Sequence, residues 1–154
     1  GTVGGGVVLS MGVVGSDREG EQETLRLRSL LDLLREEALL QTRDYGVLFT
    51  AAGYRFYIYD YVSALWVEPP DDELLAQHNL PEALRLDLVI EEREVVLAPT
   101  FERIEDEEPE PQVMILSSGE LTPFTAELSR ELAEGRFVLT VGIDGKIEVA
   151  EDDF

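Results

Sequence analysis

The 154-residue sequence contains no cysteine, and this absence excludes disulfide bonds, thiolate metal ligands and cysteine nucleophiles together. It contains a single histidine, His78, which excludes a zinc site built from several histidines. No serine or aspartate stands with His78 in an evident catalytic triad motif, so we expect no catalytic role for this residue. The compartment stays open, because a chain without cysteine is compatible with both the cytosol and the periplasm.

Basic residues are also scarce, since 12 Lys and Arg face 33 Asp and Glu and leave a formal net charge of −21. Such a field repels the phosphates of nucleic acids and anionic lipid headgroups, so we expect neither as a partner. It favours cations, basic partners or simply solubility. A hydrophobic content of 44% predicts a folded protein, and the length fits one domain with a proper core.

No long hydrophobic run is present either. Residues 1–15 are uncharged and glycine-rich, but they are shorter than the roughly 20 apolar residues that span a bilayer. No positive segment precedes them, as it would in a signal peptide, and their glycine spacing matches no phosphate-binding loop. We therefore divide the chain into residues 1–20, the remnant of an N-terminal hydrophobic segment or a leader, and residues 21–154, a globular domain with its own N-terminal helix.

The clearest element is a helix predicted over Glu21–Asp44, with Ser16 or Asp17 as its cap. Leucine, arginine, glutamate and alanine dominate this stretch, and no proline or glycine interrupts it from residue 21 onward. Apolar residues recur at steps of three and four and form one stripe that another element must cover. The stripe consists of Leu27, Leu30, Leu31, Leu34, Ala38 and the polar Gln41.

After Tyr45 the hydrophobic period changes from 3.6 to 2, which indicates about eight short strands. The predicted strands are 46–50, 54–60, 84–90, 94–97, 113–116, 124–129, 137–141 and 146–149, with 113–116 as a central strand. Asp144-Gly145 indicates a two-residue hairpin turn. We expect Trp66 to be a buried anchor, residues 71–77 to form a short helix that ends near His78, and residues 151–154 to be a frayed tail. Because the helix is not interleaved with strands, the predicted class is α+β, with the helix packed on one sheet of an antiparallel sandwich or meander.

Residues 100–111 carry six acids, one arginine and two prolines. We expect a solvated loop, because the segment is too polar to pack and its prolines prevent a helix. A calcium site is the functional alternative, since hard cations prefer clustered carboxylates. The EF-hand pattern is absent, however, and the prolines space the acids irregularly.

The order of these parts resembles the minor pseudopilins of the type II secretion system, H type (the GspH family), over residues 25–149. The sharpest piece is Ile115–Phe124, ILSSGELTPF, which resembles the family's S/P-x-G-E-x-x-P-F signature between two strands. The second piece of the resemblance lies in residues 38–56. The resemblance implies a type IV pilin-like fold and a structural, non-enzymatic subunit without a cofactor.

The resemblance further implies a role in the tip or initiation complex of the periplasmic pseudopilus, which serves protein secretion across the outer membrane. The implied partners are other minor pseudopilins, and beyond them the major pseudopilin and secreted substrates. The implied location is the bacterial inner membrane, crossed once by an N-terminal hydrophobic helix, with the globular domain in the periplasm. Family members are cleaved and methylated at the N-terminus, and neither site can be assigned in this sequence.

For the partner interface we expect contributions from Leu25, Leu27, Arg28 and Leu31, with residues before about Glu23 facing neighbouring subunits. Two other functions stay open. One is an acidic β-rich binding module that holds a cation or a basic ligand through the loop of residues 102–110. The other is an enzyme that uses two carboxylates as acid and base, although no pair in the sequence has a distinctive environment.

Overall fold

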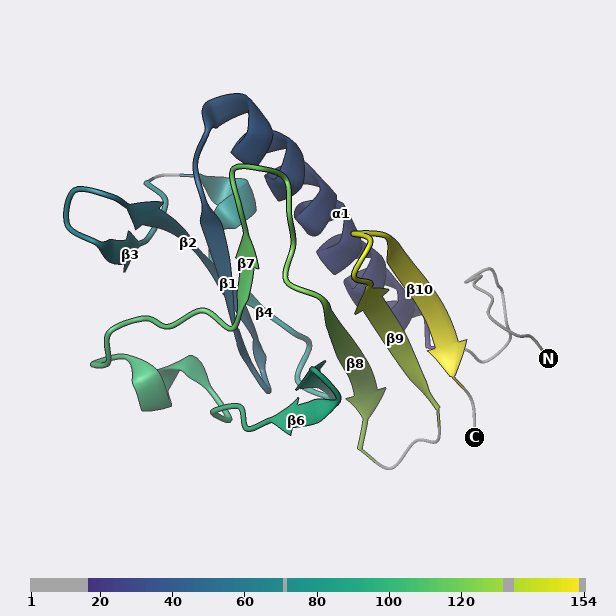
Figure 1. Ribbon diagram of the computed structural model, residues 1–154. Helices are drawn as coiled ribbons and strands as arrows, with labels where there is room; N and C mark the ends of the chain where they lie inside the picture. Colours follow the sequence, from purple (N-terminus) through teal and green to yellow (C-terminus); the bar gives the residue numbers. More distant parts are fainter. Residues whose placement is uncertain (1–16, 71, 132–134, 153–154) are drawn as a thin grey trace.

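The computed structural model describes residues 17–70, 72–131 and 135–152, and in these ranges the protein consists of one long helix and two antiparallel sheets (Figure 1). The expected α+β class is confirmed. Residues 1–16, which include most of the expected hydrophobic remnant, lie outside the described residues. None of the helices in the described ranges is long and apolar enough to cross a bilayer.

The ten described strands divide equally between the sheets, and every strand pairs antiparallel with its neighbours. The first sheet has the order β3 (Leu65–Val67), β2 (Gly53–Asp60), β1 (Tyr45–Thr50) and β7 (Val113–Ile115), and β4 (His78–Asn79) also pairs with β2. The second has the order β10 (Ile147–Asp152), β9 (Arg136–Val141), β8 (Phe124–Arg130), β5 (Leu84–Ile90) and β6 (Arg93–Val95). Two 3₁₀ turns, η1 (Glu73–Leu75) and η2 (Phe101–Ile104), lie in the connections.

Helix α1 spans Arg18–Gln41, so it begins and ends three residues earlier than the sequence predicted. It begins after Asp17, whose carboxylate accepts a hydrogen bond from the Gly20 amide at 2.8 Å, and the expected cap is thereby confirmed. It ends because Thr42 adopts the left-handed conformation, with φ of 51°, and cannot continue a right-handed helix.

The predicted apolar stripe of α1 is buried from Leu27 to Ala38. The stripe does not extend to Gln41, which is exposed, because the last turn of α1 projects beyond the sheets (Figure 1). At its other end the buried face continues to Gly20 and Thr24, so the expectation that residues before Glu23 face neighbours is wrong for Gly20. Thr24 satisfies its hydroxyl there by donating to the Gly20 carbonyl at 2.8 Å.

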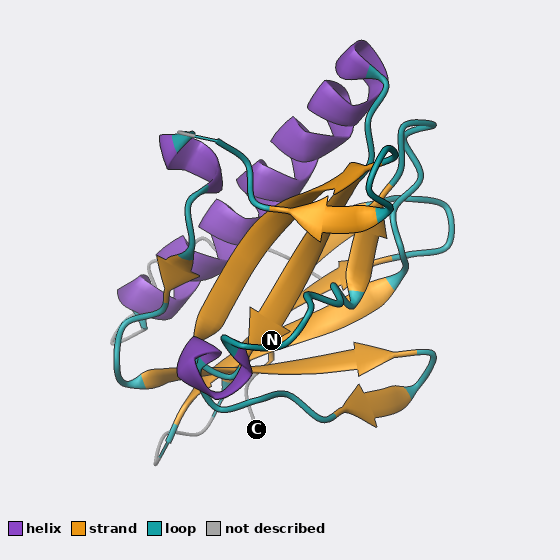
Figure 2. Ribbon diagram, turned by 90° about the vertical axis from the view of Figure 1, so that its left-hand side faces the viewer, coloured by secondary structure: helices purple, strands orange, loops and turns teal. Residues whose placement is uncertain are grey.

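The helix stripe contributes to one core that also contains side chains from both sheets, rather than packing on a single sheet as predicted. Val47 and Phe56 enter this core from the first sheet, and Leu86 and Leu139 enter from the second. Figure 2 shows α1 lying behind the strands of the first sheet. The sequence could not show this arrangement, because alternation fixes which face of a strand is apolar and not which element covers it.

The first sheet is also covered on its outer face. This agrees with the sequence of β2, which places aromatic residues on both faces of the strand. Leu48, Tyr57 and Phe101 form a second apolar cluster there, with Trp66 and Ile104 packed at its margin. The acidic segment of residues 100–111 therefore does not simply lie in solvent, because Phe101 anchors it to the sheet. Trp66 is only partly buried, since it lies on the edge strand β3 and has a neighbouring strand on one side only.

Several shorter predictions need correction. β7 is an edge strand rather than a central one, because β1 is the one described strand that pairs with it, and its other side has the isolated bridge Ile115↔Leu121. The helix expected over residues 71–77 is only the single turn η1, and His78 lies in β4 instead of at a helix end. Glu151 and Asp152 belong to β10, which pairs with β9 as far as Asp152↔Arg136, so the chain is not frayed there.

Candidate interaction surface

The described residues contain no group of three or more His, Asp or Glu that could hold a metal ion. His78 lies 2.7 Å from Glu23 through Nε2 and Oε1, and its ring centroid lies 5.3 Å from that of Tyr54. This pair connects β4 to α1 and leaves the His78 side chain 20% exposed. His78 therefore helps to hold the helix against the first sheet.

The beginning of α1 is fastened to the second sheet by a three-residue ionic cluster. Arg130, the last residue of β8, donates to both carboxylate oxygens of Asp17 at 2.7 and 2.9 Å and to Glu19 at 2.7 Å. Burial opposes the ionisation of Asp17, but the Arg130 and Gly20 hydrogen bonds outweigh it, so the pKa of Asp17 lies below its ordinary value. The two carboxylates in turn raise the pKa of Arg130.

The structure separates the four helix residues that were expected at a partner interface into two pairs. Leu27 and Leu31 have no exposed surface, because both side chains lie in the core beneath α1. Leu25 is 37% exposed, and Arg28 is exposed on the solvent side of the helix. Only Leu25 and Arg28 are therefore accessible to a partner of the folded domain.

The segment Ile115–Phe124 forms a compact loop between β7 and β8. The Leu116 amide donates to the Glu120 carbonyl and the Gly119 amide to the Leu116 carbonyl, both at 2.8 Å. Gly119 adopts φ of +92°, which favours glycine, and the Leu39 side chain of α1 lies against it. The Ser117 amide donates to the Asp44 carboxylate at 2.8 Å. This loop is thus held against the last turn of the helix and the residues that follow it.

The turn between β9 and β10 reaches the same region from the other side. Five residues lie between the paired Val141 and Ile147, not the two predicted, and within this turn the Gly142 amide donates to the Lys146 carbonyl at 3.0 Å. Gly145 has φ of +86°, a left-handed conformation that glycine adopts without strain. Its carbonyl accepts a hydrogen bond from Arg35 Nη2 of α1 at 2.6 Å.

Between this loop and this turn lies a pocket of about 520 Å³. Its apolar lining comes from Met114, Leu121 and Pro123 on one side and Ile143 on the other. Ile143 is 93% exposed, although it is an isoleucine at the tip of a turn. Arg35 also lines the pocket, and its buried Nε has no hydrogen-bond partner among the described residues. Such a pocket can accept an apolar side chain of a second protein, with a carboxylate or carbonyl near Arg35.

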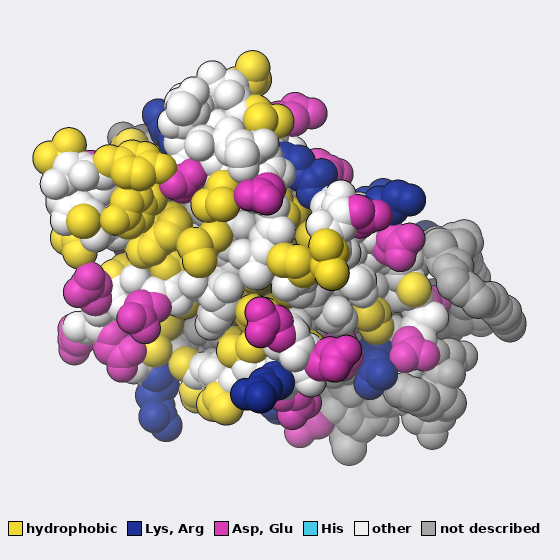
Figure 3. Space-filling model, in the orientation of Figure 1, with side chains coloured by type: hydrophobic (Ala, Val, Ile, Leu, Met, Phe, Trp, Pro, Cys, Tyr) yellow, Lys and Arg dark blue, Asp and Glu magenta, His cyan; other side chains and the backbone are white. Residues whose placement is uncertain are grey.

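A second apolar surface lies on the β2–β3 hairpin. Figure 3 shows hydrophobic side chains gathered on the left of the molecule, over β2 and β3. Tyr61 is 64% exposed and Val62 96% exposed in the turn, and Leu65 and Val67 of β3 are 41% and 39% exposed. The alternation in Leu65-Trp66-Val67 indicated a strand but not an exposed one, because short edge strands carry the same pattern as covered strands.

Comparison with known proteins places these features in a family. The sequence model described as Type II transport protein GspH matches residues 23–145, which include most of α1, the Ile115–Phe124 loop and the tip of the β9–β10 turn. The chain belongs to the GspH family. The resemblance to this family is thereby confirmed.

Relatives of this GspH-family protein agree with that assignment. It is 36% identical to Type II secretion system protein H of Pseudomonas aeruginosa, over 93% of this chain and 84% of that protein. It is 28% identical to Type II secretion system protein H of Aeromonas hydrophila, over 99% of this chain and 86% of that protein. The GspH-family protein is a minor pseudopilin of the type II secretion system.

Solved structures show the same fold. The minor pseudopilin EpsH from the type II secretion system of Vibrio cholerae superposes with a TM-score of 0.68 at 26% identity, covering 85% of this chain and 95% of that one. The solution structure of E. coli GspH superposes with a TM-score of 0.62, covering 88% of each chain at 20% identity. The second likeness concerns the fold alone.

Proposed function

We propose that this pseudopilin is a subunit of the tip or initiation complex of the pseudopilus and acts by assembly with other minor pseudopilins rather than by catalysis. Family membership supports the assembly role. The observation that carries the proposal is the pocket beside Ile143, because it is bounded by the family-signature loop Ile115–Phe124 and by the helix at once. An exposed apolar residue next to an open apolar pocket favours contact with another protein.

The implied arrangement places the globular domain in the periplasm and the hydrophobic segment N-terminal to α1 in the inner membrane. In a pseudopilus built in this way, the helices of neighbouring subunits lie side by side. The solvent-facing side of α1 is then the surface that a neighbouring helix can contact. We therefore place Leu25 and Arg28 in a helix–helix contact and Ile143 in a contact between globular domains. The major pseudopilin and secreted substrates are further candidates for these surfaces.

Substitutions at the two surfaces test the proposal in cells that lack their own copy of the gene. Leu25→Glu and Ile143→Arg should each lower co-purification of the other minor pseudopilins about tenfold, the effect of removing one well-packed interface side chain. Secretion through the system should fall in parallel. Because both residues contact solvent in the isolated domain, its melting temperature should stay close to that of wild type.

Arg85→Glu is the control, because the Arg85 side chain is 64% exposed on β5 and lies outside both proposed contacts. It should leave co-purification and secretion unchanged. Wild-type co-purification of both Leu25→Glu and Ile143→Arg would contradict the proposed surfaces. Equal loss for Arg85→Glu would mean that any change of surface charge disturbs the assembly.

A further inference from the structure

The acidic segment that follows β6 is fixed on the outer face of the first sheet, so its carboxylates have defined positions. Phe101 is 5% exposed, and the Arg55 guanidinium lies 4.6 Å above its ring. At the far end of the segment, the Gln112 side chain accepts from the Phe49 amide at 2.8 Å and donates to the Phe49 carbonyl at 3.2 Å. Gln112 thereby pairs with β1 as a neighbouring strand would.

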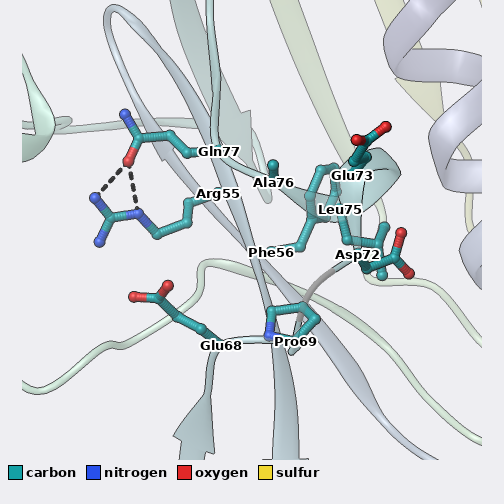
Figure 4. A pocket seen from close by; sticks show the side chains of 9 residues that line it. All are labelled: Arg55, Phe56, Glu68, Pro69, Asp72, Glu73, Leu75, Ala76 and Gln77. Atoms are coloured by element: carbon teal, nitrogen blue, oxygen red, sulfur yellow. Dashed lines mark hydrogen bonds between the residues drawn. The ribbon is translucent and has the colours of Figure 1, made fainter.

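Two grooves lie on this face, and both are lined by Arg55 and Glu68. The first has a volume of about 540 Å³ and extends toward η1, and the second has a volume of about 410 Å³ and extends beneath the acidic segment. Figure 4 shows the first groove, with Arg55 and Glu68 on one side, Asp72 and Glu73 on the other, and Leu75 between.

The grooves are strongly acidic. Their carboxylates are Glu68, Asp72, Glu73, Glu105, Glu107, Glu108 and Glu110. The one basic residue in their lining, Arg55, already donates to Gln77 Oε1 from Nε at 2.9 Å and from Nη2 at 2.5 Å. Within the described part of the chain, no salt bridge joins any of the seven acids to a basic side chain.

The floor of the grooves is apolar. Phe56 and Leu75 line the first groove, and Leu48 and Ile104 line the second. At the rim of the second groove stands Val96, which is 95% exposed. An apolar floor beneath a carboxylate rim fits the side chains of lysine and arginine, which bury an aliphatic stem and keep a charged head in solvent.

We propose that these two grooves dock a basic segment of a partner protein, in which lysine or arginine residues alternate with apolar ones. A metal ion is the poorer occupant, because the described residues contain no group of three carboxylates close enough to share one. The acids lie along the grooves instead, where each can meet a separate basic side chain. The complementary charge also speeds encounter with such a segment. This docking surface is separate from the pocket beside Ile143 and does not depend on the role proposed for that pocket.

Fluorescence anisotropy with a labelled peptide tests the proposal. The probe alternates lysine with leucine over eight residues, and its counterpart carries glutamate in place of lysine. The full 154-residue protein should bind the lysine peptide and not the glutamate peptide, with affinity that falls as salt is raised. Glu68→Gln combined with Glu108→Gln should weaken binding about tenfold, since two charge pairs are lost. Val96→Ser should weaken it to a smaller extent.

The matched control is Glu36→Gln combined with Glu148→Gln, which removes the same charge from exposed positions on α1 and β10. It should leave peptide affinity within about twofold of wild type, because these carboxylates lie outside both grooves. Equal weakening in both double variants would overturn the proposal and show that net charge alone attracts the peptide. Absence of binding at low salt, or a calcium-dependent rise in melting temperature without peptide binding, would also overturn it.

Discussion

At the residue scale, Asp17 connects the start of α1 to the second sheet. Its carboxylate caps the helix through the Gly20 amide and pairs with Arg130 through two hydrogen bonds. Its side chain is 24% exposed and that of Arg130 27% exposed, so solvent screens the pair only in part. Such a charge-assisted pair contributes more than an ordinary surface ion pair.

Asp17→Asn should remove the carboxylate charge and keep the helix cap, because asparagine caps helices about as well as aspartate. We expect a loss of about 1 kcal/mol in unfolding free energy at pH 7. The pKa of Asp17 is lowered in the folded protein, so its stabilisation is present above the unfolded pKa near 3.8 and is lost as pH falls through the folded value.

Denaturant unfolding of both proteins between pH 7 and pH 2.5 provides the measurement. The difference between wild type and Asp17→Asn should be constant above about pH 4.5 and should shrink below it. A difference that does not change over this range would show that the Arg130 pair contributes no stability.

A substitution at Leu31 tests whether the apolar stripe of α1 is covered by its own sheets or by neighbouring subunits. Leu31→Ala should lower the unfolding free energy by about 2–5 kcal/mol, because the side chain is completely buried and its removal leaves a cavity. Leu40→Ala is the control, since Leu40 is 78% exposed, and it should cost less than about 0.5 kcal/mol. A cost below that value for Leu31→Ala would mean that the stripe is covered by neighbouring subunits rather than by its own sheets.

The sequence predicted individual residues best where one local signal decides the outcome. Asp17 stands directly before a periodic helix, and Asp144-Gly145 is a turn signal. Phe101 is the contrary case, because a single aromatic residue among acids has no periodicity to distinguish an anchor from a loop residue. Its burial depends on Leu48 and Tyr57, which lie more than 40 positions earlier in the chain.

At the element scale, the β9–β10 turn joins the last hairpin to the helix. The Gly145 backbone at φ of +86° directs its carbonyl toward Arg35, and this contact spans 110 positions of sequence. No local pattern could have predicted it. The turn length was predicted wrongly for a related reason, since Asp144-Gly145 is compatible with both a two-residue turn and the five-residue turn observed.

Replacement of Gly145 tests how far that turn depends on its backbone conformation. Gly145→Val should cost about 1–3 kcal/mol, because a β-branched residue is strained at positive φ. Gly145→Asn should cost less than half as much, since asparagine tolerates the left-handed region. Ile143→Val, at an exposed position of the same turn, is the neutral control, and thermal unfolding measures all three. A melting temperature for Gly145→Val equal to wild type would refute the positive φ.

At the scale of the whole molecule, the division of strands between two sheets decides where the functional surfaces lie. β1 and β7 are adjacent although about 60 residues separate them, and this pairing brings the Ile115–Phe124 loop to the end of α1. The sequence predicted a helix followed by strands, and the resemblance identified the signature loop. Neither could place the loop beside Ile143 and Arg35, because non-local strand pairing leaves no mark on local periodicity.

The same division produces two faces with different chemistry. One end of the molecule carries the apolar pocket between the signature loop and the β9–β10 turn. The outer face of the first sheet carries acidic grooves instead, and Figure 3 shows acidic side chains grouped at the lower left, over the segment before β7. Part of the net charge of −21 is therefore concentrated in these grooves, rather than spread evenly over the surface.

The central claim is assembly, and native mass spectrometry tests it most directly. The protein is mixed with the soluble domains of the other minor pseudopilins from its source, at low and at moderate salt. The account predicts a hetero-complex of fixed stoichiometry that Ile143→Arg weakens and Arg85→Glu leaves intact. Free monomer alone under both salt conditions, with every partner domain folded, would contradict the assembly of these globular domains through the surfaces described above.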